Sequence, residues 1–187
     1  QVQSSPALHF ACRLLVKTAS QIGDVQVRNM GTIGGSVAHN DPAADYPAAL
    51  MALEAQVKLV STSGERTLPI GEFLLDAFTT ALEPGEIISE VIVPMEASGT
   101  ATAYRKIAHP ASGFAVVGVA VRLRKSNGAI TMARIGVTGV GPIAFRAAKA
   151  EELLQSNGGS SESIKQAADA VTNGIEAQSD LYASSEY

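Results

Sequence analysis

The sequence has few of the residues that build metal sites and covalent crosslinks. It contains one cysteine, Cys12, and its three histidines (His9, His39 and His109) stand far apart. A single cysteine cannot form an internal disulfide, and it cannot supply the thiolates of an iron–sulfur cluster or a cysteine-based zinc site. We therefore expect no metal centre made from this chain's own residues.

Long apolar runs and an excess of positive charge are also missing. No segment reaches the roughly 18 apolar residues of a membrane-spanning helix, and no basic-then-apolar leader begins the chain. Lys and Arg number 14 against 18 Asp and Glu, which disfavours nucleic-acid binding because phosphate recognition needs clustered cations. Hydrophobic residues, in contrast, make up 46% of the 187 positions, enough for a sizeable core. We expect a cytoplasmic protein, with peripheral association at the inner face of the membrane as an alternative.

The first expected element is a helix over residues 5–23. Ser5 suits its N-cap, Pro6 its first position and Gly23 its end. Apolar residues recur between them at steps of three and four and form one stripe, on which Cys12 lies. We interpret Cys12 as a small buried hydrophobe, because no cationic, exposed setting is present to make its thiol reactive.

The remaining pattern favours an α+β fold. Residues 27–45 are polar, rich in glycine and without a regular period, which predicts a loop. The other expected elements are helices over 43–55, 72–78, 144–155 and 161–178, and strands over 57–60, 66–70, 87–93, 103–108, 114–124 and 129–138. Because strands and helices are grouped, we expect an α/β subdomain over 1–97 and a C-terminal domain over 98–187 with a three-stranded antiparallel sheet packed with helices.

The segment 31–36, Gly-Thr-Ile-Gly-Gly-Ser, is a candidate phosphate site. Paired glycines allow positive φ and close approach of a ligand, and successive N–H groups can then converge on an anion. Thr32 and Ser36 add hydroxyl donors. The segment is neither a P-loop nor the G-x-G-x-x-G fingerprint, and an ordinary glycine turn remains open. Arg28 nearby could neutralise phosphate or serve packing alone.

Asp45 follows ten residues after Gly35, in the first turn of an expected helix. Its carboxylate suits a ribose or polyol hydroxyl, although an acid is also favourable there through the helix dipole. Asp41 is more simply a cap, and His39 a polar loop residue. A second glycine-rich segment, 136–141, has the wrong spacing for a nucleotide site, so we interpret it as a structural turn. No hydrolase or metalloprotease motif is present, so we expect no catalytic residue.

The run 27–47, VRNMGTIGGSVAHNDPAADYP, resembles the second flavin loop of the FAD-binding medium subunits of molybdenum hydroxylases, of the carbon monoxide dehydrogenase and xanthine dehydrogenase type. Shorter pieces follow in the family's order: 85–88 ending at 93–94, then 104–106, 112–115 and a closing motif at 179–187. Ser36 stands where the family often has Asn.

The resemblance implies a flavin site on named residues. The segment from Thr32 to Ser36 would hold the FAD diphosphate, and Asp45 would bind the ribityl chain. Ile88 would lie beside the isoalloxazine, with Tyr104 or Lys106 near the ring's other edge. The implied cofactor-binding residues are Thr32, Ile33, Gly34, Gly35, Ser36, Asp45, Ile88, Tyr104 and Lys106.

The implied function is electron transfer inside a larger complex. A large subunit would carry molybdenum with molybdopterin cytosine dinucleotide, and a small subunit would carry two [2Fe–2S] clusters. Electrons would reach FAD on this chain and pass to an external acceptor, with a dimer of heterotrimers as the expected assembly. The protein's task would be to place and tune the cofactor.

Two features of this interpretation are expectations about the chain itself. The family's first glycine-rich flavin loop lies upstream of what matches Gln1, so we expect this polypeptide, lacking the N-terminal FAD subdomain, to bind FAD weakly or not at all on its own. The alternatives are a subunit-interaction module that has lost flavin binding and an unrelated α+β protein that binds another nucleotide through Gly34 and Gly35.

Overall fold

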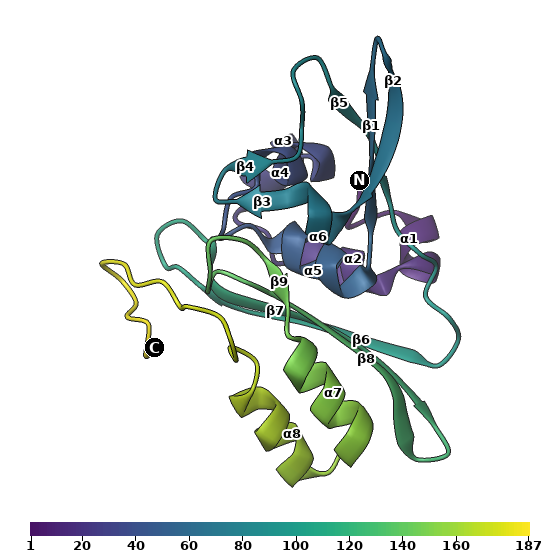
Figure 1. The fold of residues 1–187 in the computed structure, drawn as a ribbon, viewed down its shortest axis with the longest axis vertical. Helices are drawn as coiled ribbons and strands as arrows, with labels where there is room; N and C mark the ends of the chain where they lie inside the picture. The colour runs from purple at the N-terminus through teal and green to yellow at the C-terminus, as the bar shows by residue number, and fades with distance from the viewer.

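A computed structural model describes residues 1–187 as an α+β fold, as the sequence predicted. The fold is built around one central helix, α5 (Asp45–Leu53) (Figure 1). The other helices are α1 (Pro6–Ala11), α2 (Arg13–Ala19), α3 (Val25–Met30), α4 (Ile33–His39), α6 (Ile70–Phe73), α7 (Ala148–Asn157) and α8 (Ser161–Asp169). The strands are β1 (Gln56–Ser61), β2 (Gly64–Pro69), β3 (Leu74–Asp76), β4 (Thr79–Thr80), β5 (Ile87–Ile92), β6 (Thr100–Ala108), β7 (Ala115–Ser126), β8 (Ala129–Thr138) and β9 (Phe145–Arg146).

The first expected helix is two helices, which corrects the prediction of one element over 5–23. The Oγ of Ser5 accepts the N–H of Leu8, and Pro6 opens α1 as predicted. The chain then breaks at Cys12, whose φ is −153°. The carboxylate of Glu96, far along the chain, accepts the N–H groups of Arg13 and Leu14 at 3.1 and 3.3 Å and starts α2. Cys12 is buried, as predicted.

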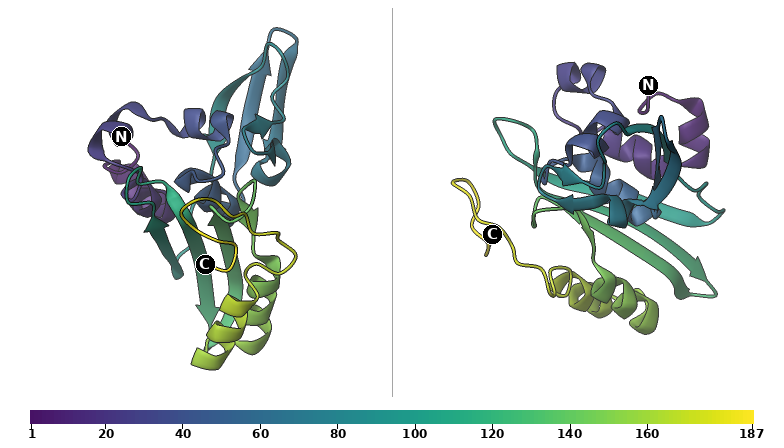
Figure 2. Two further views of the ribbon diagram at one scale, coloured as in Figure 1. Left: turned by 90° about the vertical axis from the view of Figure 1, so that its left-hand side faces the viewer. Right: turned by 45° about the horizontal axis from the view of Figure 1, so that its top comes forward.

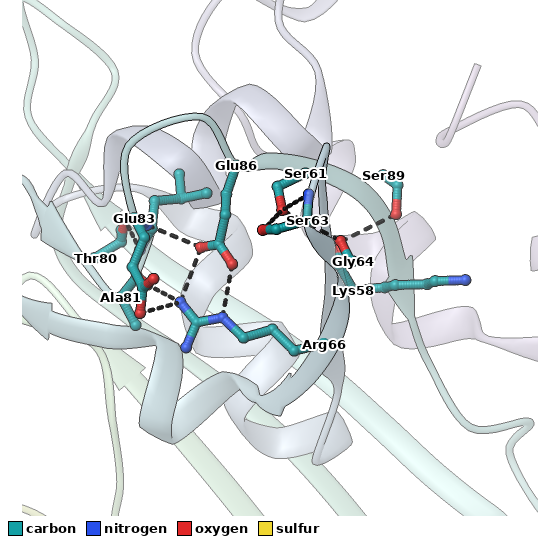
Figure 3. Close-up of polar contacts among 11 residues, drawn as sticks. Lys58, Ser61, Ser63, Gly64, Arg66, Thr80, Ala81, Glu83, Glu86 and Ser89 are labelled. Atoms are coloured by element: carbon teal, nitrogen blue, oxygen red, sulfur yellow. Dashed lines mark hydrogen bonds and ion pairs between the residues drawn. The ribbon is translucent and has the colours of Figure 1, made fainter.

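The expected hairpin between residues 57 and 70 is confirmed. Strands β1 and β2 pair antiparallel from Gln56↔Pro69 to Ser61↔Gly64, and β5 joins the other edge of β1. This sheet projects from the rest of the molecule (Figure 1). Arg66 fixes the loop before β5, because its guanidinium donates to both carboxylate oxygens of Glu86 at 2.7 and 2.8 Å (Figure 3).

The C-terminal sheet has four strands in the order β6-β7-β8-β9, all antiparallel, which corrects the expected three. The added strand, β9, is only two residues long and is held by the burial of Phe145 opposite Val137. The β7–β8 turn is the predicted one, with Asn127 and Gly128 both at positive φ.

Helix α5 covers one face of this sheet, and α7 and α8 cover the other (Figures 1 and 2). The close approach of α5 requires Gly136, because a Cβ there would lie 1.9 Å from the carbonyl oxygen of Ala48. Gly139 has φ +86° and would place a Cβ 2.4 Å from the Val116 oxygen. Gly136 and Gly139, two of the three glycines of segment 136–141, are therefore structural, as the sequence predicted.

The core joins the two halves of the chain. The buried cluster around Leu50 and Leu53 of α5 includes Tyr104, Ala120 and Ala144 from beyond residue 98. A second cluster lies between the sheet and the α7–α8 pair. The N-terminal half thus rests on the C-terminal sheet through α5, and that contact positions the segment described next.

Three boundaries differ from the sequence expectation for local reasons. The expected helix 72–78 is the short α6 followed by the β3–β4 hairpin, whose turn holds Phe78 at φ +54°. The helix expected from 144 begins at Ala148, after β9. The last helix ends at Asp169 rather than 178, ahead of Gly174 at φ +81°. No helix has the length and hydropathy required to span a bilayer.

Candidate flavin site

The glycine-rich segment is helical where the sequence predicted a loop. The carboxylate of Asp24 accepts the N–H of Val27 at 2.8 Å and caps α3. The Oγ1 of Thr32 accepts the N–H of Gly35 at 2.9 Å and caps α4. None of the glycines at 31, 34 and 35 has positive φ. The prediction of a turn whose N–H groups converge on an anion is therefore wrong. The two caps explain the error, because each starts a helix inside a polar sequence.

The start of α4 nevertheless presents free donors. The N–H groups of Ile33 and Gly34 have no acceptor within the chain, as the geometry of a helix N-terminus requires. No atom lies within 4 Å of the place where a Cβ on Gly34 would be. The hydroxyls of Thr32 and Ser36 flank these amides. Neutral donors at a helix start, with open space beside them, fit an anion such as a diphosphate.

A cleft of 1240 Å³ extends from this helix start. Its wall is made by the N-terminal residues 1–4, helices α3 and α4, the start of α5 and the segment 112–114 that precedes β7. The apolar side chains of Ile33 and Phe114 face it, together with the polar groups of Ser36, Asp45 and Ser112. A large cavity lined by apolar surface and a few polar groups is typical of cofactor sites.

Asp45 is a buried carboxylate on this wall, 5% exposed. Its Oδ1 accepts the hydroxyl of Tyr104 at 2.5 Å, and its Oδ2 accepts the ammonium of Lys106 at 3.0 Å. Lys106 also donates to the carbonyl oxygens of Gln21 and Gly113. Each carboxylate oxygen has a further lone pair, so Asp45 can still accept a hydroxyl from a ligand in the cleft.

Burial and neighbouring charge set the protonation of this cluster. Burial raises the pKa of Asp45, while the Tyr104 hydroxyl and the Lys106 ammonium act in the opposite direction. Burial and the negative charge of Asp45 raise the pKa of Tyr104 far above its usual value. Tyr104 is consequently a permanent donor at physiological pH, and the carboxylate depends on its two partners to stay ionised.

The expected site residues fall into two groups. The cleft is lined by Thr32, Ile33, Gly35, Ser36 and Asp45, and Gly34 lies among them on the first turn of α4. The other three do not line the cleft. Ile88 packs on β5 against the main core, and Tyr104 and Lys106 lie behind Asp45 with their side chains buried. Whether any of the nine contacts flavin stays a prediction.

Sequence reasoning gave no role to several residues that the fold brings to the cleft. Phe114, with Ser112 and Gly113, closes one side. The signal in the sequence was the glycine at 113. In the structure, Gly113 has φ +71° and would place a Cβ 3.1 Å from the Cα of Gly23. Arg28, which the sequence offered either for phosphate or for packing, also lines the cleft, and its guanidinium donates to the carbonyl oxygens of Ile22 and Gly23. No group of three acidic, histidine or cysteine side chains is placed to hold a metal ion.

Two family profiles cover nearly the whole chain. Residues 1–96 match the family described as "FAD binding domain in molybdopterin dehydrogenase". The chain belongs to this flavoprotein family. Residues 102–187 match the "CO dehydrogenase flavoprotein C-terminal domain". The donors at the start of α4 and most residues of the cleft wall therefore lie within the first match, while the segment 112–114 of the wall lies within the second.

Curated relatives agree along most of this flavoprotein's length. It is 38% identical over 184 residues to the carbon monoxide dehydrogenase medium chain of Hydrogenophaga pseudoflava, covering 98% of this chain and 64% of that protein. It is 35% identical to the glyceraldehyde dehydrogenase medium chain of Sulfolobus acidocaldarius, covering 97% of this chain and 62% of the relative. The chain thus spans slightly less than two thirds of these relatives.

Solved structures show the same fold. Carbon monoxide dehydrogenase from Hydrogenophaga pseudoflava superposes with a TM-score of 0.95 at 40% identity, covering all of this flavoprotein and 65% of that chain. Quinoline 2-oxidoreductase from Pseudomonas putida 86 gives a TM-score of 0.90 at 29% identity, covering 98% of this chain and 64% of that one.

Proposed function

We propose that the cleft beside α4 binds FAD and that the chain serves as an electron-transfer subunit of a molybdenum-containing dehydrogenase. The observation that carries the proposal is the position of the open α4 N-terminus in a large cleft, inside the segment that matches an FAD-binding domain. When bound, FAD supplies the redox chemistry, and the protein supplies placement and electrostatics.

Different residues at the cleft would bind different parts of the cofactor, each according to its chemistry. The amides of Ile33 and Gly34 and the hydroxyls of Thr32 and Ser36 would donate to the diphosphate, where the helix dipole favours negative charge. The carboxylate of Asp45 would accept a hydroxyl of the ribityl chain. The absence of a side chain at Gly34 leaves the room that a diphosphate needs. These assignments use only groups that line or adjoin the cleft.

The family and the names of the relatives support a more specific role in a complex. Several relatives are medium chains or subunits of dehydrogenases, including carbon monoxide, glyceraldehyde and nicotinate dehydrogenases. By analogy this chain would receive electrons from [2Fe–2S] clusters on a small partner and pass them to an external acceptor. A large partner would carry molybdenum with molybdopterin cytosine dinucleotide, in a dimer of heterotrimers.

Flavin analysis of the native protein, purified as it assembles in the cell, tests the proposal. We expect one FAD per copy of this chain, identified as FAD rather than FMN after release by acid and chromatography. Ser36→Ala should weaken retention of FAD by roughly 5- to 10-fold, the loss of about 1 kcal/mol for one hydrogen bond. Ser89→Ala, on β5 and outside the cleft, is the matched control and should retain FAD normally.

Two results would overturn the proposal. A native complex that contains this chain and molybdenum but no flavin would favour the interaction module instead. A different nucleotide bound in stoichiometric amount would show that the cleft serves another ligand.

A further inference from the structure

Asp45 is held from behind by the C-terminal sheet. Both of its partners, Tyr104 and Lys106, come from β6, two residues apart and therefore on the same face of the strand. Their side chains are almost completely buried and do not line the cleft. The carboxylate, in contrast, belongs to the cleft wall. The arrangement places two donors on the side of Asp45 that faces away from a ligand.

The surrounding residues are fitted to this arrangement. Gly118 on β7 leaves the space for the phenol, because a Cβ there would lie 2.4 Å from the hydroxyl oxygen of Tyr104. On β8, the hydroxyl of Thr138 lies 2.8 Å from the carbonyl oxygens of Pro42 and Ala44, immediately before Asp45. All three long strands of the sheet thus contribute to the position of one carboxylate.

We propose that Tyr104 and Lys106 are positioning residues, which hold the Asp45 carboxylate ionised and in place at the wall of the FAD cleft without touching the cofactor themselves. The inference rests on the proposed function, because it assigns these residues a part in FAD binding. It also gives the C-terminal sheet a task, which is to complete a site whose ligand-facing residues lie mostly in the N-terminal half.

Physical chemistry requires such support. An ionised carboxylate buried without partners shifts toward its neutral form, and a neutral carboxyl is a weaker acceptor for a ligand hydroxyl. A charge-assisted hydrogen bond from each donor counters this shift. The ionisable groups that surround Asp45 or share its cleft are Tyr104 and Lys106 on β6, Tyr46 on α5, and Arg28, His39 and Asp41 on the cleft wall.

The pH dependence of FAD affinity is the first test, measured on the native protein after removal and readdition of FAD. In wild type, affinity should fall on the acid side as Asp45 takes up a proton. Tyr104→Phe should move that midpoint upward by about one pH unit and weaken binding roughly tenfold near the midpoint. Lys106→Gln should move it in the same direction, and Lys106→Arg should restore it. Asp45→Asn should lack the midpoint.

A double-mutant cycle separates positioning from direct contact. If Tyr104 acts through Asp45, Tyr104→Phe costs no further affinity in an Asp45→Ala background. A loss that persists in that background would mean that the phenol touches FAD, and it would overturn the proposal. Ser163→Ala is the matched structural control, since it removes a buried hydroxyl of α8, which donates to the carbonyl oxygen of Asn157 at 3.0 Å and does not line the cleft. It should lower the melting temperature and leave the pH midpoint in place.

The outcomes distinguish failure of the proposed FAD binding from failure of the positioning role. Wild-type protein that binds no FAD even when purified as it assembles in the cell would refute the proposed function. Wild-type protein that binds FAD with a midpoint unmoved by Tyr104→Phe and Lys106→Gln would refute only the positioning role. If Tyr104→Phe fails to fold, the Lys106→Gln and Lys106→Arg pair gives the same decision.

Discussion

The Oγ1 of Thr32 accepts the N–H of Gly35 at 2.9 Å, and the same oxygen lies 2.9 Å from where a Cβ on Gly35 would be. The Thr32 cap therefore requires that residue 35 have no side chain. Gly34, the preceding residue, has no atom near its own missing Cβ. The two adjacent glycines thus serve different purposes: Gly35 leaves room for the Thr32 cap, and Gly34 leaves open space at the helix start, next to the residues that line the cleft.

Alanine at each glycine should separate these purposes. Gly34→Ala meets no obstacle and should stabilise the FAD-free protein by up to about 1 kcal/mol through helix propensity, while weakening FAD binding because its methyl group enters the ligand's space. Gly35→Ala should displace the Thr32 hydroxyl, and the lost cap, about 1 kcal/mol, should offset the propensity gain. Urea unfolding and FAD titration measure the two effects. Wild-type FAD affinity in Gly34→Ala would contradict the placement of the diphosphate.

The elements that the sequence predicted correctly have local causes. Ser5 and Pro6 define the start of α1, and Asn127-Gly128 defines the β7–β8 turn, because capping and positive φ are properties of a few adjacent residues. The helices α3 and α4 were missed although their caps, Asp24 and Thr32, are also local. A glycine-rich polar stretch has low helix propensity, so caps and tertiary contacts decide its structure.

At the candidate site, too, the features set by neighbouring residues could be predicted and those set by tertiary contacts could not. The segment from Thr32 to Ser36 and the acid at Asp45 could be identified because they form one continuous run. The burial of Asp45 against Tyr104 could not be deduced, since the two residues are 59 positions apart and meet only when α5 packs on the sheet. Phe114 reaches the cleft for a similar reason, through the turn before β7.

The break between α1 and α2 should depend on Glu96. Its carboxylate caps α2 from a distant part of the chain, so Glu96→Ala should lower the free energy of unfolding by about 1 kcal/mol, the usual cost of a lost N-cap. Glu90→Ala is the control, because Glu90 makes only an exposed ion pair with Lys58 at 3.6 Å and should change stability by less than about 0.5 kcal/mol. Chemical denaturation measures both. Equal effects would show that Glu96 is an ordinary surface acid.

The ion pair between Arg66 and Glu86 should make stability depend on acid pH. The hydrogen bonds from Arg66 lower the pKa of Glu86 to about 2, against an ordinary value of 4.5. A carboxyl whose pKa is lower in the folded state binds fewer protons there than in the unfolded chain. Its stabilising contribution is therefore complete above pH 4.5 and is lost progressively as the pH falls toward about 2.

Glu86→Gln should accordingly be less stable than wild type at pH 6, and the difference should shrink between pH 4.5 and about 2. The measurement is a series of urea unfolding curves across this range. Glu72→Gln, on α6, is the control for the substitution itself, because Glu72 forms no hydrogen bond or ion pair through its side chain in the structure, and it should change stability at pH 6 by less than about 0.5 kcal/mol. A difference for Glu86→Gln that stays constant between pH 6 and the acid end of the range would show that Arg66 does not hold the carboxylate in solution, and that the loop before β5 is fixed by other contacts.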